Sequence, residues 1–392
     1  MTEAWQLRTI DSLCSRVTSG GTPARTRSDY YGGQIPWVKT GELLDALIVD
    51  TEEKITDLGL AESSAKLLPA GTVLMAMYGA TVGALGMLGR EATCNQASCA
   101  MIADPRRADA RWLFYALLND RSRIITRATG AAQQNLSAAS VKQFTYLTPP
   151  LAEQQAIAEV LGALDDKIAA NTALAATADR YLAALLDEMA AGRGATTLGA
   201  VADVNRRTVK PSPDAGLRYV DIASVANGRF DHPDITPWAE APGRARRGLS
   251  AGDTMWSTVR PNRRSHALNL EDDPLLVAST GLAILSPREV GFAYLYEASR
   301  RPEFTAYLEN VAEGSAYPAV RADRFLDAPI PDLPADQIAA FEGQAAPLRE
   351  LVASQARESR TLAATRDALL PQLMSGKLRV RDAERLASDA GA

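Results

Sequence analysis

Two short stretches of the sequence concentrate side chains that can bind anions and planar polar groups. Arg260-Pro261-Asn262-Arg263-Arg264 holds three arginines and an asparagine, and Gln133-Gln134-Asn135 holds three consecutive amides. A guanidinium group binds phosphate oxygens or pairs bidentately with guanine, and a carboxamide pairs in the same way with adenine. Such groups on a loop could read base edges, whereas positive charge alone would contact phosphates. The alternatives are a loop cap for the amides and solvated surface for the arginines.

Other candidates of the same chemistry lie on predicted loops or where a predicted strand ends. We favour the cluster at 260–264 because it follows a predicted strand at the place where the first half of the chain has Tyr78-Gly79. Tyr317 aligns near the amide run and occupies the equivalent loop. The remaining candidates are Arg25, Arg27, Lys39, Tyr78, Arg206, Arg207, Arg244, Arg246 and Arg247.

Catalytic motifs are weak. Thr148-Pro149-Pro150-Leu151 lacks the amide and the aromatic ring with which the Asn-Pro-Pro-aromatic motif of adenine methyltransferases grips a flipped base. Neither a dinucleotide-type glycine motif nor a P-loop occurs in the sequence. Asp45 with Glu52-Glu53-Lys54 has the loose spacing of a metal nuclease site, but the corresponding segment of the second half has no such lysine. We therefore expect no catalytic, cofactor or metal site on this chain.

The amino-acid composition narrows the classes of protein to which this chain could belong. The three cysteines, Cys14, Cys94 and Cys99, lack zinc-ligand spacing and are expected to be buried thiols, with only two histidines present. The net charge of −5 disfavours a protein that coats nucleic acid indiscriminately. No secretory pattern opens the sequence and no long apolar window occurs, so we expect a cytoplasmic protein without membrane contact.

The chain repeats itself, and the second copy begins near residue 196. Several local patterns recur in the same order in both halves, each half ending in a long helical segment. Within each half, short β-type runs (35–38, 73–78, 99–102; 218–222, 254–259, 282–285) precede a helical region (109–128; 289–310), which predicts α+β modules on a twisted sheet. The matching patterns are Trp37-Val38-Lys39-Thr40 with Tyr219-Val220-Asp221-Ile222, Leu68-Pro69-Ala70-Gly71 with Leu249-Ser250-Ala251-Gly252, Trp112-Leu113-Phe114-Tyr115 with Ala293-Tyr294-Leu295-Tyr296, Thr148-Pro149-Pro150-Leu151 with Ile330-Pro331-Asp332-Leu333, and the segments from Leu185 to Gly192 and from Leu369 to Gly376.

Each module is followed by a predicted coiled-coil helix. The first begins after Pro149-Pro150 and keeps a heptad spacing over about 38 residues, or about 57 Å. The second keeps the spacing with polar interruptions, and Pro347 is expected to kink or restart it. A two-fold arrangement would bury both seams in an antiparallel pair. The expected seam residues are Ile157, Leu161, Leu164, Ile168, Asn171, Leu182, Leu185, Leu348, Val352, Leu362, Leu369 and Leu373.

With these features the chain resembles the specificity (S) subunits of type I restriction-modification systems over nearly its whole length. The most specific runs are Pro149-Pro150-Leu151-Ala152-Glu153-Gln154 and Leu369-Leu370-Pro371-Gln372-Leu373-Met374. Asp332-Leu333-Pro334-Ala335-Asp336-Gln337 departs from the expected start of the second helix. Further matching runs are Ser19-Gly20-Gly21-Thr22-Pro23, Tyr30-Tyr31-Gly32-Gly33, Ile35-Pro36-Trp37-Val38-Lys39-Thr40, Tyr78-Gly79-Ala80-Thr81-Val82-Gly83, Asn95-Gln96, the segment from Gly252 to Arg264 and Ser375-Gly376-Lys377-Leu378.

The resemblance implies target-recognition domains at 1–149 and 193–333, helices at 150–192 and 334–380, and a tail at 381–392. It implies a two-part double-stranded DNA site, one part per domain, with a spacer fixed by the helices. Two methyltransferase subunits and motor-nuclease (restriction) subunits are the implied partners in phage defence. S-adenosylmethionine, ATP and Mg would be bound by those partners, and none by this chain. The alternatives are a scaffold that does not read sequence and a recognition arm of another nuclease-methyltransferase system.

Overall fold

The computed structural model describes residues 4–129, 135–212 and 214–392. By its internal contacts the chain divides into two compact units. The first unit comprises Met1–Ala170 with Glu358–Ala392, and the second comprises Asn171–Arg357. Each unit therefore holds one mixed module together with parts of the same two long helices, α6 (Leu151–Ala190) and α9 (Ala335–Met374).

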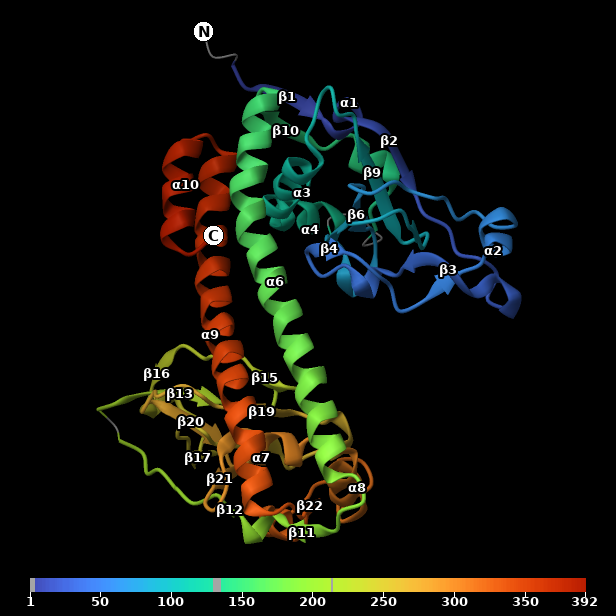
Figure 1. Cartoon of the computed structure of the whole chain (residues 1–392). Helices are drawn as coiled ribbons and strands as arrows, with labels where there is room; N and C mark the ends of the chain where they lie inside the picture. The colour runs from blue at the N-terminus through green and yellow to red at the C-terminus, as the bar shows by residue number, and fades with distance from the viewer. Residues whose placement is uncertain (1–3, 130–134, 213) are drawn as a thin grey trace. The chain divides into compact units, whose positions relative to one another are not determined.

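The module of the first unit is built on a five-stranded sheet of order β2-β9-β6-β7-β4, with a three-stranded sheet, β5-β3-β8, and a two-stranded sheet, β1-β10 (Figure 1). The strands are β1 (Gln6–Thr9), β2 (Cys14–Ser19), β3 (Tyr31–Val38), β4 (Ala46–Ile48), β5 (Lys54–Ile55), β6 (Val73–Ala76), β7 (Leu85–Leu88), β8 (Thr93–Cys94), β9 (Ser98–Ala103) and β10 (Thr145–Thr148). The helices are α1 (Ile10–Leu13), α2 (Asp57–Ala61), α3 (Ala110–Asn119), α4 (Arg121–Thr129) and α5 (Ala138–Lys142).

The module of the second unit has two four-stranded sheets, β12-β21-β18-β19 and β16-β13-β20-β17, and two two-stranded sheets, β11-β22 and β14-β15. The strands are β11 (Ala195–Thr197), β12 (Ala202–Val204), β13 (Gly216–Val220), β14 (Val225–Ala226), β15 (Arg229–Phe230), β16 (Ile235–Pro237), β17 (Ala245–Gly248), β18 (Thr254–Ser257), β19 (His266–Leu268), β20 (Leu276–Ser279), β21 (Leu282–Pro287) and β22 (Pro329–Pro331). The helices are α7 (Phe292–Ser299) and α8 (Pro302–Asn310).

The repeat holds for most of the strands. The antiparallel order β2-β9-β6-β7 recurs as β12-β21-β18-β19, and the sheet β5-β3-β8 recurs as β16-β13-β20, with a parallel pair in both. The pair β1-β10, which directly precedes α6, recurs as β11-β22 before α9. The α+β class and the internal repeat expected from the sequence are therefore confirmed.

The central strand of each main sheet is buried on both faces, because side chains alternate across a strand. In the first unit Val73 and Met75 of β6 pack into the core that also contains α3, while Leu74 and Ala76 pack into a second core. In the second unit Trp256 of β18 packs against α7 and α8, and the neighbouring Met255 belongs to a separate core. One face of each main sheet thus packs against helices, and the other face packs into a separate core. Strands β6 and β18 are equivalent.

Within each unit the segments of α6 and α9 run antiparallel. In the first unit Asp165 pairs with Arg366 at 2.7 Å, and Leu161 and Leu164 share a core with Leu362. The expected seam residues Ile157, Leu369 and Leu373 lie in that same core, with Ile168 packed at its edge.

In the second unit Asp179 pairs with Arg349 at 2.5 Å, and Leu182 shares a core with Phe341. The amide of the buried Asn171 donates to the carbonyl of Gln355 at 3.3 Å. The seam there also buries Leu186, which the heptad count omitted. Leu185 and Leu348 pack at the edge of this core, and Val352 is half-buried.

Of the kink or restart expected at Pro347, the restart of the C-terminal helix is contradicted. The helix does not restart at Pro347, because α9 continues through this residue from Ala335 to Met374. The missing N–H and the ring at a proline disfavour a helix interior by about 3 kcal/mol, but Phe341 and Ala345 before Pro347 and Arg349 after it are all buried. That packing holds α9 together across the proline.

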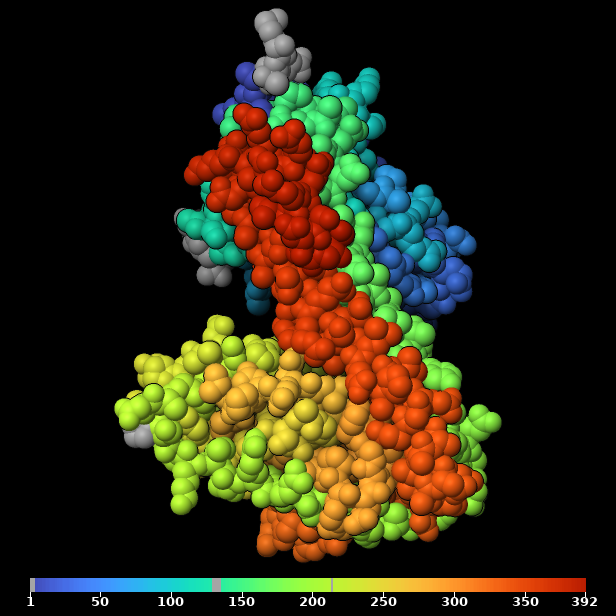
Figure 2. Space-filling model, turned by 60° about the vertical axis from the view of Figure 1, so that its left-hand side comes forward, coloured from blue at the N-terminus to red at the C-terminus, as the bar shows by residue number. Residues whose placement is uncertain are grey.

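The expected tail contains a helix. Helix α10 (Val380–Asp389) follows α9 and buries Ala383 and Ala387 in the core of the first unit. Figure 2 shows the outer face of α10 at the surface, where Arg381 and Arg385 are exposed.

The three cysteines are buried and free. In the part of the chain that the structure describes, no helix is long and apolar enough to cross a membrane. Across residues 4–129, 135–212 and 214–392, no group of three or more His, Cys, Asp or Glu residues could hold a metal ion.

Candidate nucleic-acid interface

Each module carries a tight turn after its central strand. The first turn (residues 79–83) follows β6, and the second turn (residues 260–264) follows β18. Both begin and end with left-handed backbone: φ is 74° at Gly79 and 82° at Gly83, and 53° at Arg260 and 52° at Arg264. Glycine adopts this conformation freely, whereas a residue with a Cβ is disfavoured there by roughly 1–2 kcal/mol. The two turns thus share a backbone shape but differ in the side chains they present.

A returning loop pairs with the strand end at each turn. In the first unit Asn135 forms an antiparallel bridge with Tyr78, whose hydroxyl donates to the carbonyl of Gln96 at 2.8 Å. In the second unit Ala319 bridges Val259 in the same manner. Asn135 is exposed. The predicted candidates Gln133 and Gln134 lie outside the described residues.

The second turn presents an open group of polar side chains. The guanidinium of Arg260 lies over the ring of Tyr317, with 4.4 Å from its carbon to the ring centroid, and donates to the carbonyl of Ala316 at 3.4 Å. Tyr317 is 68% exposed. Asn262 and Arg263 are exposed, and their side chains have no hydrogen-bond or ion-pair partner within the described chain. These four residues form what we call the open cluster.

Arg264 behaves differently from its neighbours. Its guanidinium Nη2 donates to the backbone carbonyl of Arg300, at 2.5 Å, and its Nε is buried without a partner among the described residues. The side chain therefore points into the unit rather than outward. The structure brings together the candidates Arg260, Asn262, Arg263 and Tyr317, but it gives Arg264 a contact inside the protein.

The other predicted arginines of the second unit gather beside β17. The segment before β13 pairs with this strand, since Val209 N donates to the carbonyl of Arg246 at 2.8 Å and Thr208 bridges Arg247. Arg206 and Arg244 are exposed at the two ends of this region. Arg207 donates to the carbonyl of Leu249, and Arg246 donates to the carbonyl of Ala245 at 2.8 Å. The Nε of Arg247 is buried.

The cations predicted in the first unit are held by carboxylates. Arg25 lies 2.5 Å from Glu53 and over the rings of Tyr31 and Trp37, at 4.6 and 4.8 Å from their centroids. Lys39 contacts the same Glu53 at 3.0 Å. Hydrogen bonds from Arg25 and then Lys39 hold the pKa of the Glu53 carboxyl below its usual range.

Two further pairings complete this neutral surface. Lys39 also lies 2.6 Å from Glu52, and Arg27 lies 2.7 Å from Asp29 and over the ring of Tyr30 at 4.4 Å. The hydrogen bond from Arg27 lowers the pKa of Asp29. Three cations here face carboxylates at close range, so little positive charge is left for a phosphate.

Asp45, Glu52, Glu53 and Lys54, the residues with nuclease-like spacing, all form ion pairs within the protein. Asp45 pairs with Arg121 of α4, and Lys54 pairs with Asp50 at 3.1 Å. Glu52 and Glu53 are occupied by Lys39 and Arg25. These contacts account for each residue of the pattern without a metal ion.

Sequence reasoning missed an ion network on the helix-covered side of the second module. Arg349 of α9 contacts Glu297 of α7 and Asp179 of α6, and Arg300 contacts the same two carboxylates. The sequence signal was present but weak, because Asp179 and Arg349 lie next to seam positions without belonging to the seam. The first unit has a simpler counterpart, in which Asp165 accepts from the hydroxyl of Tyr115 at 2.6 Å and pairs with Arg366.

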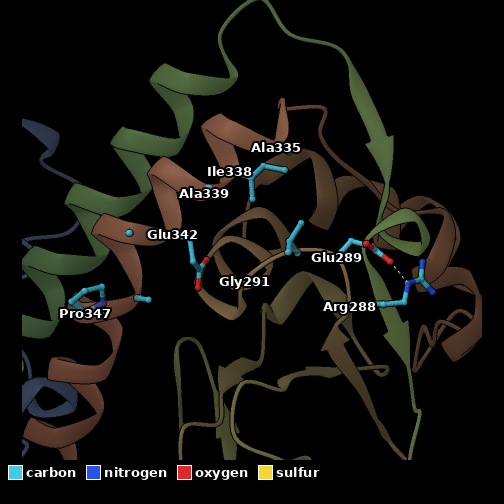
Figure 3. Close-up of a pocket in the computed structure, with 11 residues that line it drawn as sticks. Arg288, Glu289, Gly291, Ala335, Ile338, Ala339, Glu342 and Pro347 are labelled. Carbon is cyan, nitrogen blue, oxygen red and sulfur yellow. Dashed lines mark ion pairs between the residues drawn. The ribbon is translucent and has the colours of Figure 1, made fainter.

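A hollow of about 700 Å³ lies at the first turns of α9 in the second unit (Figure 3). Glu342 points from α9 toward Gly291, and its carboxylate accepts from the backbone N–H groups of Ala293 at 3.1 Å and Tyr294 at 2.8 Å. The free N–H groups at a helix start favour such an anion. Glu342 thus caps α7, and the lining beside it is mainly apolar, with Ile338 and Pro347.

Comparison with known proteins bears on both units. Residues 2–178 match the family model described as the type I restriction modification DNA specificity domain. The first module and most of α6 are thus similar to the specificity subunits of type I restriction-modification systems. The family model does not cover the second module.

Two similar specificity subunits come from distant organisms. The EcoR124I/EcoR124II specificity subunit of Escherichia coli is 27% identical over 153 residues, which are 37% of this chain and 37% of that subunit. The MjaIX specificity subunit of Methanocaldococcus jannaschii is 27% identical over 170 residues, or 42% of this chain and 38% of that subunit. The matches thus span about two fifths of the length of these relatives.

The fold of the whole chain is similar to a solved S subunit. The crystal structure of the type I restriction-modification S subunit from M. genitalium superposes with a TM-score of 0.57 at 19% identity, covering 94% of this chain and 96% of that one. At this identity the likeness establishes the specificity-subunit fold, including the second module and α9.

Proposed function

We propose that this specificity subunit reads a double-stranded DNA target in two parts, with each module contacting one half-site. The observation that carries the proposal is the pair of equivalent turns after β6 and β18, which share a backbone shape and differ in their exposed side chains. Sequence readers vary the side chains on loops held by a constant scaffold, because base edges are distinguished by donor and acceptor pattern. The match of residues 2–178 to the DNA specificity domain model supports the same function.

In the second module the open cluster supplies the reading groups. Arg263 is free to donate two parallel hydrogen bonds to guanine, and Asn262 can pair with adenine. Arg260, stacked on Tyr317, is held at a fixed orientation beside them. In the first module Tyr78 and Asn135 occupy the equivalent position.

We further propose that α6 and α9 set the separation of the half-sites and recruit two methyltransferase subunits and the restriction subunits. The chain itself then performs no catalysis, and S-adenosylmethionine, ATP and Mg are bound by the partner subunits in the cytoplasm. Its net charge of −5 fits this division, since partners that surround the DNA share the phosphate contacts.

Mapping of adenine methylation in the host genome tests the proposal. We expect a two-part, asymmetric motif that disappears when this gene is deleted and returns with a plasmid copy. A methylome without any motif that depends on this chain contradicts it. Purification of the chain with its partners adds a second test, because a scaffold would bind partner subunits but give no sequence-dependent methylation.

A further inference from the structure

The buried ion network of the second unit has the connections needed to position the DNA-facing turn. It contains two arginines and two carboxylates, and it joins three helices: Asp179 belongs to α6, Glu297 to α7 and Arg349 to α9. Arg300, the residue that ends α7, completes it with contacts of 2.9 Å to Asp179 and 3.3 Å to Glu297. The charges balance within the group.

The network is buried around Arg349 and Glu297, whereas the side chains of Arg300 and Asp179 are 17% and 35% exposed. The side chains of Arg349 and Glu297 are 5% and 2% exposed. The guanidinium groups of Arg300 and Arg349 lie over the ring of Tyr296, at 5.0 and 4.9 Å from its centroid. Burial of ion pairs contributes little net stability, since desolvation offsets the attraction, but it can fix one geometry. A network in this place is therefore suited to orientation more than to stability.

One contact connects the network to the reading surface. The guanidinium of Arg264, the last residue of the second turn, donates to the backbone carbonyl of Arg300. Arg300 in turn is held by the carboxylates of Asp179 and Glu297. Strand β19 begins at His266, directly after the second turn. The buried ring of His266 contacts Trp256 and Tyr296, with 4.9 and 5.7 Å between ring centroids. The turn is thereby anchored to the helices at its C-terminal end.

We propose that Arg264 and the network of Asp179, Glu297, Arg300 and Arg349 are positioning residues that orient the second turn for reading its half-site. This inference rests on the proposed reading of DNA by the second module. Arg264 keeps left-handed backbone at the end of the turn, so its side chain leaves inward while Asn262 and Arg263 face outward. Fixing the turn against α6, α7 and α9 limits the orientations of Arg263, and bidentate base recognition depends on such a limit.

The first unit lacks this connection and provides a matched control. Arg111 of α3 pairs with Asp166 of α6 at 2.8 Å, which ties a module helix to α6 as Arg300 does in the second unit. Among the described residues neither Arg111 nor Asp166 has a hydrogen bond or ion pair with the first turn, where a Cβ at Gly83 would meet Ile125 and Ile124. Substitution of Arg111 should therefore leave both half-sites unchanged.

The decisive experiment replaces two network residues that DNA cannot touch. The variant Arg349→Met/Glu297→Gln removes one positive and one negative charge, and the pair of Arg300 and Asp179 remains. Expressed in the host strain lacking this gene, with its partner subunits, it should relax the second half of the methylation motif by about tenfold in base preference and leave the first half intact. Arg111→Met should give the wild-type motif.

A second variant keeps the inference testable if the double variant does not fold. Arg264→Asn removes the contact to Arg300, and asparagine tolerates left-handed backbone. It should relax the second half-motif in the same direction without a change in the amount of complex recovered. An unchanged second half-motif from either folded variant overturns the inference. Absence of any two-part motif with the wild-type chain would instead contradict the proposed function.

Discussion

The two modules carry predicted DNA-binding cations in opposite electrostatic settings. In the first unit Arg25, Arg27 and Lys39 each lie within 3 Å of a carboxylate, whereas in the second unit Arg263 has no ion-pair partner among the described residues. An arginine whose charge is compensated by a carboxylate attracts a phosphate less strongly. The comparison teaches that the carboxylates around an arginine, more than the arginine itself, indicate which module offers positive charge to DNA.

The two modules also differ in how their helices are joined. One carboxylate, Asp165, links Tyr115 and Arg366 in the first unit. In the second unit two carboxylates and two arginines form a closed group that reaches the turn through Arg264. The second module is therefore the one whose reading surface should respond to changes at the helices.

The largest expected difference between the units is in stability. Arg349→Met leaves Glu297 buried with less compensation and should destabilise the second unit by about 3–5 kcal/mol. Arg366→Met should destabilise the first unit by only about 1 kcal/mol, because the side chains of Arg366 and Asp165 are 21% and 26% exposed. Hydrogen exchange followed peptide by peptide measures both. Equal losses of protection in the two units would refute the distinction.

The next effect is on DNA binding. Arg263→Ala should weaken binding of the assembled complex to its cognate duplex by about tenfold or more, since one bidentate base contact is worth about 1–3 kcal/mol. Arg27→Ala should change it by less than about twofold, because the charge of Arg27 is already compensated. Gel-shift titrations at one salt concentration give both values. A larger effect of Arg27 than of Arg263 would reverse the assignment.

A pH effect confined to the second unit is the third prediction. Burial lowers the pKa of His266 to about 3 from an ordinary value of 6.5, reinforced by Arg300, Arg264 and Arg349 and opposed by Asp179. Below pH 6.5 the unfolded chain binds a proton at the His266 ring, whereas the folded chain keeps this ring uncharged. His266 therefore leaves the free energy of unfolding unchanged above pH 6.5. As the pH falls below 6.5, the free energy of unfolding decreases by about 1.4 kcal/mol per pH unit down to the folded pKa.

His266→Phe isolates this effect. Neither ring nitrogen of His266 has a partner in the described structure, and the ring lies against aromatic side chains, so phenylalanine should fit. The variant should match the wild type in denaturant unfolding near neutral pH and exceed it in stability at about pH 5 by roughly 2 kcal/mol. Parallel pH profiles for the two proteins would show that His266 is not the cause.

The smallest expected effect comes from exchanging the residues that begin the two turns. Arg260→Gly relieves left-handed backbone but loses the contact with Tyr317, so the free energy of unfolding should change by less than about 1 kcal/mol. Gly79→Arg should destabilise by about 1–2 kcal/mol, although a Cβ there would meet no atom within 4 Å. Thermal unfolding of both variants checks the comparison, and a stabilised Gly79→Arg protein would contradict it.

Much of the fold could be predicted from the sequence because its signals are local or periodic. The repeat, the helix start after Pro149-Pro150, and the strands around Val73 and Thr254 depend on patterns within a few residues of one another. The expected restart at Pro347 was wrong because a local preference worth about 3 kcal/mol was outweighed by packing along α9. Helix α10 was missed although Val380, Ala383 and Ala387 recur on one helical face, because this face spans only 10 residues.

For the reading surface, the sequence by itself determined the residue types and their place after the central strand of each module. It placed Arg260, Asn262, Arg263 and Tyr317 as candidates, and the structure brings these four together. Only the tertiary structure decided which arginines are open. Arg264 turns inward and Arg25 faces Glu53, and both contacts join residues far apart in the chain. Charge compensation depends on distances in space, and the composition of a sequence carries no record of them.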